Sequence, residues 1–273
     1  MAGPTILQLP RGEVCTQGAQ ALRWRAADGR DVLFVSAHAK FAAGTPIRGG
    51  VPVVFPWFGD DPEQRGRPAH GFARRVPWQL TAASDPAAGR VGFALQDDAG
   101  TRALWPHAFA AELAIAFDRE LVLALAVTNR GAAPFRFEAL LHTYLLVGDV
   151  RAVELRGLHG ARYHDKRVGT RAAQREEVLR CTGEVDRVYQ GTGAACTLLD
   201  PGLRRLITVS KDNAPSTVVW NPWHDKAALL TDLGGDEWLR FLCVESGCVA
   251  DDAVTLAPGA THRLQVRIAC QAM

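Results

Sequence analysis

Short apolar runs alternate with polar breaks from one end of the chain to the other. The runs are rich in Val, Leu, Ile and Phe, and Gly, Pro, Asp and Asn interrupt them, which is typical of strands. Helical periodicity is scarce, and the polar segment 166–179 is expected to be a surface connection with room for a short helix. Many short strands at fairly regular spacing predict an all-β, antiparallel sandwich or barrel.

Two hairpins are predicted from local patterns. Asp28-Gly29 lies between two strand-like runs in 24–35, and this pair favours the positive-φ turn of a tight hairpin. A second hairpin pairs 112–117 with 121–128, and the next turn is expected at 129–131. Further strands are expected at 91–96, 135–147, 205–209, 217–220, 241–245 and 264–269.

Length and composition are those of one ordinary globular domain. The 273 residues are 48% hydrophobic and 22% charged, which is enough apolar material for a sizeable core. Because no linker, charge run or repeat divides the chain, residues 1–273 are predicted to form a single domain. A formal net charge of +2 is too balanced for a nucleic-acid-binding surface. No apolar stretch approaches the roughly 20 residues of a membrane-spanning helix, so no membrane partner is expected.

The N-terminus and the cysteines both predict the cellular location. The N-terminus lacks a basic segment followed by an apolar stretch, so no secretory signal is predicted and the cytoplasm is the expected location. The six cysteines are scattered without Cys-x-x-Cys spacing, which favours reduced thiols over a disulfide framework or a zinc site. Nucleotide-binding, zinc-protease and α/β-hydrolase motifs are also missing from the sequence.

The first candidate group lies between residues 47 and 74. Gly49-Gly50 allows a close backbone approach, and the prolines and aromatics nearby suit either a sugar-binding loop or a tight turn with core aromatics. Arg48 and Arg74 suit phosphate oxygens, because a guanidinium donates paired hydrogen bonds, although a solvated surface charge is the commoner use. His70 begins the motif that ends at Arg74.

Two ionisable residues interrupt or end apolar runs. His142 lies inside 135–147, which otherwise reads as a buried strand, and histidine exchanges protons well near neutral pH. Its alternative is a hydrogen-bonded core histidine. Glu245 ends the run 241–244, where partial desolvation would raise its pKa and make it a suitable base. The alternative for Glu245 is an exposed acid at a strand end.

A last group combines aromatic and polar side chains. Trp220 and Trp223 flank Asn221-Pro222, which suits a stacking platform with an amide that binds hydroxyls, although tryptophan in a sandwich is more often core. Asp186 lies upstream, and Lys226 is either an anion contact or a solvated charge.

Taken in order, these motifs resemble the glucose-6-phosphate 1-epimerase (hexose-6-phosphate mutarotase) branch of the aldose 1-epimerase family. The resemblance covers most of the chain, and the ordered set is specific although each motif alone is weak. The matching segments are Arg48-Gly49-Gly50-Val51-Pro52, Pro56-Trp57-Phe58-Gly59, His70-Gly71-Phe72-Ala73-Arg74, His142-Thr143-Tyr144, Asp186-Arg187-Val188-Tyr189, Val218-Val219-Trp220-Asn221-Pro222-Trp223 and Cys243-Val244-Glu245.

The resemblance implies a galactose-mutarotase-like β-supersandwich with its site on the concave face of a sheet. It implies Glu245 as the general base and His142 as the general acid. It also implies that two arginines hold the 6-phosphate while the other binding residues contact the sugar. The substrate-binding residues that it implies are Arg48 and Arg74 for the phosphate and His70, Asp186 and Trp220 for the sugar.

The expected reaction needs only proton transfers. A base removes the proton of the anomeric hydroxyl while an acid, held on the opposite side of the C1–O5 bond, protonates the ring oxygen and lets the ring open. No metal or other cofactor is therefore expected. The predicted function is a mutarotase for D-hexose 6-phosphates, glucose 6-phosphate first, acting as a monomer on a small-molecule sugar phosphate. The alternatives are a mutarotase for unphosphorylated aldoses and a non-catalytic carbohydrate-binding β-sandwich.

Overall fold

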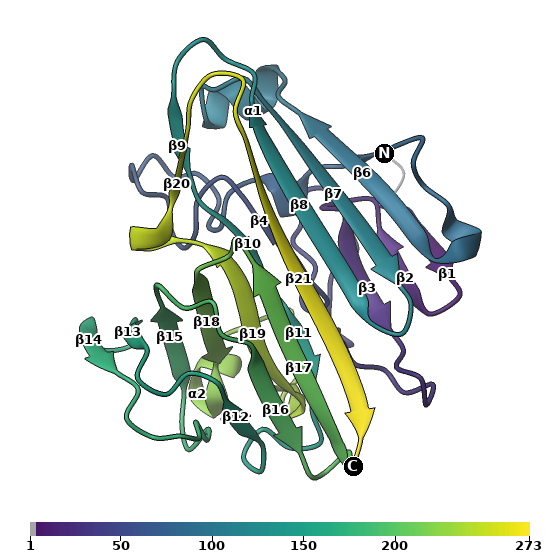
Figure 1. The fold of residues 1–273 in the computed structure, drawn as a ribbon, viewed down its shortest axis with the longest axis vertical. Helices are drawn as coiled ribbons and strands as arrows, with labels where there is room; N and C mark the ends of the chain where they lie inside the picture. Colours follow the sequence, from purple (N-terminus) through teal and green to yellow (C-terminus); the bar gives the residue numbers. More distant parts are fainter. Residues whose placement is uncertain (1–3) are drawn as a thin grey trace.

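Antiparallel strands dominate residues 4–273, the part of the chain that the computed structural model describes (Figure 1). Two eight-stranded sheets carry most of them, and the predicted all-β, antiparallel architecture is confirmed. Residues 1–3 lie outside the described residues. They begin the N-terminal segment in which the sequence predicts no secretory signal.

The inner sheet carries the residues that matter most below. Its central strand β19 is buried along its whole length, because the outer sheet covers one face and N-terminal loops cover the other. In spatial order the inner sheet consists of β14 (Thr170–Ala173), β13 (Arg162–Asp165), β15 (Val185–Tyr189), β18 (Ser216–Asn221), β19 (Phe241–Cys248), β10 (Ala139–Leu141) and β4 (Val53–Val54), with β11 (Tyr144–Leu146) also paired to β19.

The outer sheet shows the period-two burial that one solvent-exposed face produces. Along β7, buried residues alternate with more exposed ones, and the buried set joins the main apolar cluster. Figure 1 shows β6, β7, β8 and β21 side by side as long strands, as their register requires. The outer sheet runs β12 (Glu154–Arg156), β16 (Cys196–Asp200), β17 (Arg205–Asp212), β21 (Thr261–Ala272), β8 (Leu121–Asn129), β7 (Phe109–Phe117), β6 (Arg90–Gln96), β5 (Gln79–Leu80).

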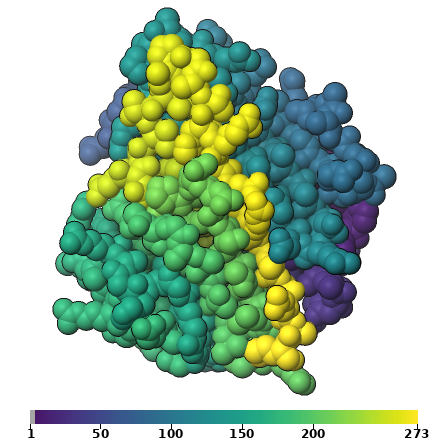
Figure 2. Space-filling view, viewed as in Figure 1, coloured from purple at the N-terminus to yellow at the C-terminus, as the bar shows by residue number. Residues whose placement is uncertain are grey.

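Smaller elements complete the fold. In the space-filling view, the C-terminal segment (yellow) runs along the visible face between green and teal parts of the chain (Figure 2). No described helix is both long and apolar enough to cross a membrane. The remaining strands and α-helices are β1 (Ile6–Leu9), β2 (Gly12–Cys15), β3 (Gln20–Trp24), the pair β9 (Phe135–Phe137) and β20 (Val254–Leu256), and the helices α1 (Ala99–Leu104) and α2 (Trp223–Ala227).

Most predicted strands form, and three expectations need correction. The hairpin of β7 and β8 is confirmed. The Asp28-Gly29 hairpin also forms, with Arg25 paired to Asp31 across the turn, but its second run is not a continuous strand and Leu33 pairs with Leu145 instead. The run 135–147 is not one strand and divides into β9, β10 and β11. In 166–179 the described element is the edge strand β14, and no helix forms there.

Candidate active site

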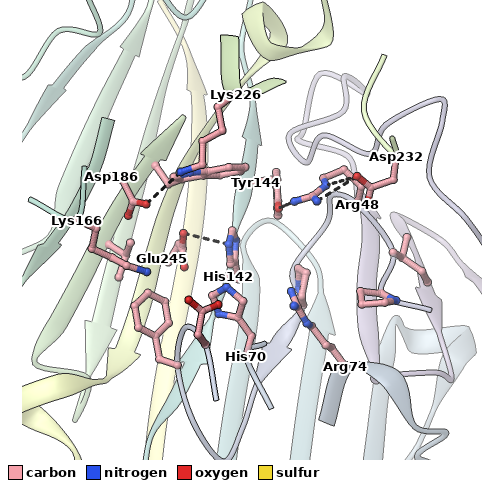
Figure 3. A pocket seen from close by; sticks show the side chains of 17 residues that line it. Arg48, His70, Arg74, His142, Tyr144, Lys166, Asp186, Lys226, Asp232 and Glu245 are labelled. Atoms are coloured by element: carbon pink, nitrogen blue, oxygen red, sulfur yellow. Dashed lines mark hydrogen bonds and ion pairs between the residues drawn. The ribbon is translucent and has the colours of Figure 1, made fainter. Parts of the chain in front are cut away.

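A cavity of about 520 Å³ opens on the inner sheet, where β10, β11, β15, β18 and β19 meet the N-terminal loops (Figure 3). All seven residues that the sequence singled out as catalytic or substrate-binding line this cavity. They are Arg48, His70, Arg74, His142, Asp186, Trp220 and Glu245.

Strand geometry brings His142 and Glu245 together. Glu245 lies inside β19 opposite Val218 of β18, and its side chain is 1% exposed, so the expectation of a partly desolvated acid at a strand end is wrong. The strand continues because Ser246 and Gly247 still pair with β10 and β18. His142 lies at the break between β10 and β11, and its backbone N–H donates a hydrogen bond to the backbone carbonyl of Pro52.

The two side chains are in direct contact. Nε2 of His142 lies 3.3 Å from Oε1 of Glu245. Burial raises the pKa of Glu245 well above its ordinary value, and the negative charge of Asp186 acts in the same direction. Burial also lowers the pKa of His142, and the neighbouring His70 and Arg74 add to this effect. Neutral forms are therefore favoured, and the pair carries one transferable proton on the carboxyl group.

His70 stands beside this pair with its ring in a defined tautomer. Its ring centroid is 5.9 Å from that of His142. Because the N–H of Gly59 donates to Nδ1 of His70 at 3.3 Å, Nε2 carries the proton of the neutral ring. Burial and the charges of Arg74, Lys166 and Arg48 lower the pKa of His70 and keep the ring neutral. His70 is thus a neutral hydrogen-bond donor next to His142.

Two arginines make one side of the cavity positive. Arg48 donates to Asp232 through Nε and Nη2 and to the hydroxyl of Tyr144 through Nη1. Three of its five N–H groups are used in this way, which leaves two for a ligand. Burial opposes the charge of Arg48, but Tyr144 and Asp232 outweigh burial and raise its pKa.

Arg74 is held more loosely than Arg48. Its Nη2 donates to the carbonyl of Ala69, and its buried Nε has no hydrogen-bond partner among the described residues. Burial lowers its pKa to about 10, so the guanidinium is still charged at neutral pH. An anion placed against Arg48 and Arg74 would find several free donors and would offset the cost of burying two like charges.

The opposite side of the cavity mixes acidic, basic and aromatic groups. Burial raises the pKa of Asp186, whose carboxylate lies 3.7 Å from Nζ of Lys226. Lys226 also donates to Glu184 at 2.8 Å, so it is held by two carboxylates. Nζ of Lys166 lies 4.8 Å from the ring of Phe58 and forms no ion pair within residues 4–273.

Some residues of the predicted motifs serve the fold instead of the cavity. A Cβ on Gly50 would lie 2.2 Å from the carbonyl oxygen of Ala21, so this glycine permits contact between backbones and not with a ligand. Phe55 is 1% exposed and packs among core aromatics, which confirms the core alternative for that position. The amide of Asn221 donates to the carbonyls of Trp238 and Phe241 and is not available to a sugar.

Sequence reasoning missed four polar lining residues, Asp60, Tyr144, Lys166 and Asp232. The polar pattern of 166–179 predicts a surface connection for Lys166, but this residue follows β13 directly and reaches the cavity. Tyr144 lies in the His142-Thr143-Tyr144 motif, which by itself predicts no role for the tyrosine, and no pattern marks Asp60 or Asp232. The link between Arg48 and Asp232 spans 184 positions, so no local signal could have found it.

Comparison with known proteins identifies what this chain is similar to. The family model described as "Aldose 1-epimerase" matches residues 11–269. An Escherichia coli K12 protein named "Putative glucose-6-phosphate 1-epimerase" is 33% identical over 93% of this chain and 85% of its own. A solved Salmonella typhimurium structure named as a "putative mutarotase (YeaD)" aligns with a TM-score of 0.90, at 30% identity, over 98% of this chain and 90% of that one.

A more distant structure shows that the fold is shared more widely. A galactose mutarotase-like protein from Lactobacillus casei aligns with a TM-score of 0.77 over 98% of this chain and 100% of its own, at 18% identity. The galactose-mutarotase-like β-supersandwich predicted above is therefore confirmed.

Proposed function

Since this chain belongs to the aldose 1-epimerase family, we propose that it interconverts the α and β anomers of D-hexose 6-phosphates, glucose 6-phosphate among them. The observation that carries the proposal is the contact between His142 and Glu245 on the wall of a cavity that also presents Arg48 and Arg74. A proton-transfer pair and an anion site together match a sugar that is both cyclic and phosphorylated.

The arrangement of the side chains orients the substrate. In Figure 3, His142 lies on the arginine side of Glu245, and Asp186 and Lys166 lie on the other side. The ring oxygen O5 is bonded to C5, which carries the C6 phosphate ester, whereas the anomeric hydroxyl O1 points away from it. A phosphate at the arginines thus brings O5 toward His142 and O1 toward Glu245, and the sugar hydroxyls face Asp186 and Trp220.

Proton transfer then opens the ring. Glu245 as a carboxylate removes the proton from O1, and His142 as an imidazolium protonates O5 while the C1–O5 bond breaks. O1 and O5 are bonded to the same carbon, so an acid and a base in contact can reach both, and they need not stand on opposite sides of the bond as expected above. This active form has the same number of protons as the neutral pair, since the proton only moves from Glu245 to His142.

The reverse reaction completes the anomerisation. Rotation about C1–C2 turns the other face of the aldehyde toward the C5 hydroxyl. Glu245, now protonated, returns its proton to the former carbonyl oxygen, and His142 removes the proton of the C5 hydroxyl as it attacks. The side chains end in their starting states, so these steps require no cofactor.

We also propose a monomer in the cytoplasm. One chain supplies every residue that lines the cavity, so a second copy is not needed to complete it. All six cysteines, each within residues 4–273, are free thiols, which is typical of a reducing compartment.

A mutarotation assay tests the proposed function. Purified protein is added to freshly dissolved α-glucose 6-phosphate, and the approach to anomeric equilibrium is followed by polarimetry, with α-glucose run in parallel. Faster equilibration of the phosphorylated sugar alone is the expected result. Equal acceleration of both sugars would instead support a mutarotase for unphosphorylated aldoses. No acceleration by folded protein would support the carbohydrate-binding alternative.

A further inference from the structure

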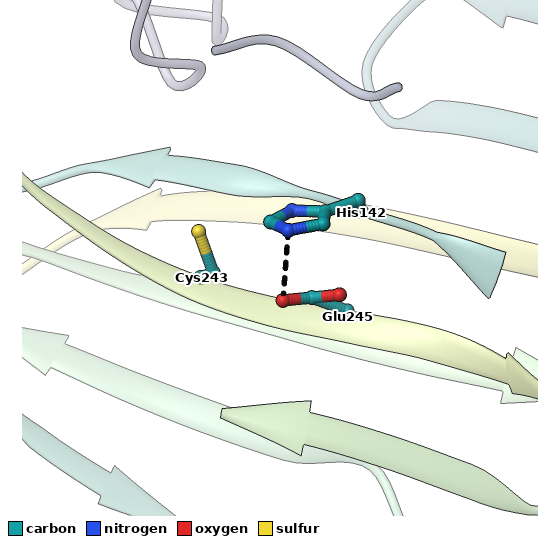
Figure 4. Close-up of side chains that lie close together, drawn as sticks. All are labelled: His142, Cys243 and Glu245. Carbon is teal, nitrogen blue, oxygen red and sulfur yellow. Dashed lines mark ion pairs between the residues drawn. The ribbon is translucent and has the colours of Figure 1, made fainter. Parts of the chain in front are cut away.

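A buried thiol lies beside the proposed acid–base pair and takes no part in the proton transfers. Cys243 precedes Glu245 by two residues on β19, so both side chains leave the strand on the same face. One ligand atom from each of His142, Cys243 and Glu245 lies within 4.8 Å of the other two, and all three residues are buried. Figure 4 shows the three side chains on one side of β19.

The donor set is the one that zinc prefers. Imidazole nitrogen, thiolate sulfur and carboxylate oxygen bind zinc at about 2.0–2.3 Å, which places tetrahedral ligand atoms about 3.3–3.8 Å apart. Nε2 of His142 and Oε1 of Glu245 are already 3.3 Å apart, and the separations of up to 4.8 Å within the cluster need to shorten by no more than about 1 Å to reach this range. The cavity lined by His142 and Glu245 leaves room for a water molecule as the fourth ligand.

A second Cys–His pair, between Cys248 of β19 and His262 of β21, lacks a third ligand within residues 4–273. Sγ of Cys248 lies 3.4 Å from Nε2 of His262, but no third ligand from the described residues joins them in a cluster. This pair provides a matched control, because it combines the same two residue types outside the cavity.

We propose that Zn²⁺ binds His142, Cys243 and Glu245 and thereby inhibits the protein. Coordination displaces the thiol proton of Cys243 and the proton carried by the His142–Glu245 pair, and both are released to solvent. With Nε2 and Oε1 bound to the metal, neither group can exchange a proton with a sugar. The inhibition rests on the proposed function, whereas the binding of the metal does not.

Metal binding is measured first, without any reference to activity. Co²⁺ serves as the probe, because its bond to a thiolate gives an intense absorption in the near ultraviolet. We expect one equivalent to produce this band in the unmodified protein and in Cys248→Ser, and Zn²⁺ to abolish it by displacement. Cys243→Ser should lack the band. Absence of the band in the unmodified protein, or its persistence in Cys243→Ser, would overturn the site.

Inhibition is measured in the mutarotation assay, with Mg²⁺ as the control ion. Zn²⁺ should inhibit the unmodified protein and Cys248→Ser alike, and a chelator should restore activity. Cys243→Ser should keep its turnover and need at least about tenfold more Zn²⁺. Equal sensitivity of Cys243→Ser would refute inhibition through this site. Circular dichroism checks folding, and Cys243→Ala replaces the serine variant if that one does not fold.

The two assays distinguish failure of the proposed function from failure of the proposed zinc site. If the metal-free protein does not accelerate anomerisation, the proposed function is wrong, but the cobalt measurement still decides whether the site exists. If anomerisation is accelerated and the cobalt band is missing, the proposed function stands and the zinc site is wrong.

Discussion

Burial governs how Glu245 and His142 share a proton. Oε2 of Glu245 and Nδ1 of His142 are buried and have no hydrogen-bond partner in the described part of the chain. Unsatisfied buried groups cost free energy, which a sugar can recover by supplying hydroxyl groups to Glu245. The cavity therefore favours a ligand whose polar groups can form these hydrogen bonds.

Replacing the base by its amide should abolish most turnover. Glu245→Gln keeps the shape of the side chain but cannot accept the proton of the anomeric hydroxyl, so turnover should fall by about 10²- to 10⁴-fold. Polarimetry with α-glucose 6-phosphate measures this loss, and circular dichroism confirms that the variant is folded. A folded variant with near-normal turnover would show that Glu245 is not the base.

The same variant should also change how stability depends on pH. Burial raises the pKa of Glu245 in the folded chain above its value in the unfolded chain. At a pH between these two pKa values, Glu245 is protonated in the folded chain and ionised in the unfolded chain. The free energy of unfolding therefore decreases as pH rises through this window, and Glu245→Gln removes this decrease. The Tm of the variant minus that of the unmodified protein should be larger at about pH 7.5 than at about pH 4. A difference that does not vary with pH would contradict the raised pKa.

Arg48 should discriminate phosphorylated from free hexoses. Hydrogen bonds to charged groups contribute about 1.5–3 kcal/mol, so Arg48→Ala should raise KM for glucose 6-phosphate about 10- to 100-fold and hardly change KM for glucose. Arg48→Lys is the matched variant, because it keeps the charge but lacks the planar fork, and its loss should be smaller. Initial rates over a range of both sugars measure the effect. An equal increase in KM for both sugars would assign Arg48 a structural role through Asp232 and Tyr144.

At the level of strands, the pairing of β10 with β19 positions His142 against Glu245. Leu140 lies opposite Gly247, and His142 follows two residues later. A Cβ on Gly247 would lie 2.1 Å from the carbonyl oxygen of Ala139, a distance that no side chain can adopt without moving β10. Gly247 is thus required where it stands.

Gly247→Ala should therefore weaken both the fold and the site. Overpacking of this kind costs about 1–3 kcal/mol, and displacement of β10 should separate His142 from Glu245 and reduce turnover. Gly193→Ala is the control, because a Cβ there meets no atom within 4 Å. Urea unfolding measures the midpoint for both variants. Equal midpoints and equal turnover would show that β10 tolerates the shift.

The strands show which features could be predicted from sequence. Short apolar runs bounded by turn residues predicted strands that match much of β6, β7 and β8, because these strands are local hairpin neighbours along the chain. The end of β19 was misplaced because Ser246 and Gly247 end the apolar run while their backbones still pair with neighbouring strands. Lys166 was missed for a related reason, since its place in the cavity depends on the long-range pairing of β13 with β15.

Across the whole molecule, the chain passes back and forth between the two sheets. It enters the outer sheet at β5, returns to the inner sheet at β10, and ends in the outer sheet at β21 after further crossings. A single apolar cluster collects residues from both sheets, including Leu123 of β8 and Val219 of β18. Neither sheet is therefore formed by one continuous segment, and neither sheet can bury its apolar face without the other.

This connectivity predicts one cooperative unfolding transition for a 273-residue chain, although chains well above about 150 residues often unfold in stages. Far-ultraviolet and near-ultraviolet circular dichroism should give the same midpoint, and the calorimetric enthalpy should equal the van't Hoff enthalpy. For a monomer, Tm should also be independent of protein concentration. Two resolved transitions would instead show that the sheets unfold separately, and a Tm that rises with concentration would show that folding is coupled to association.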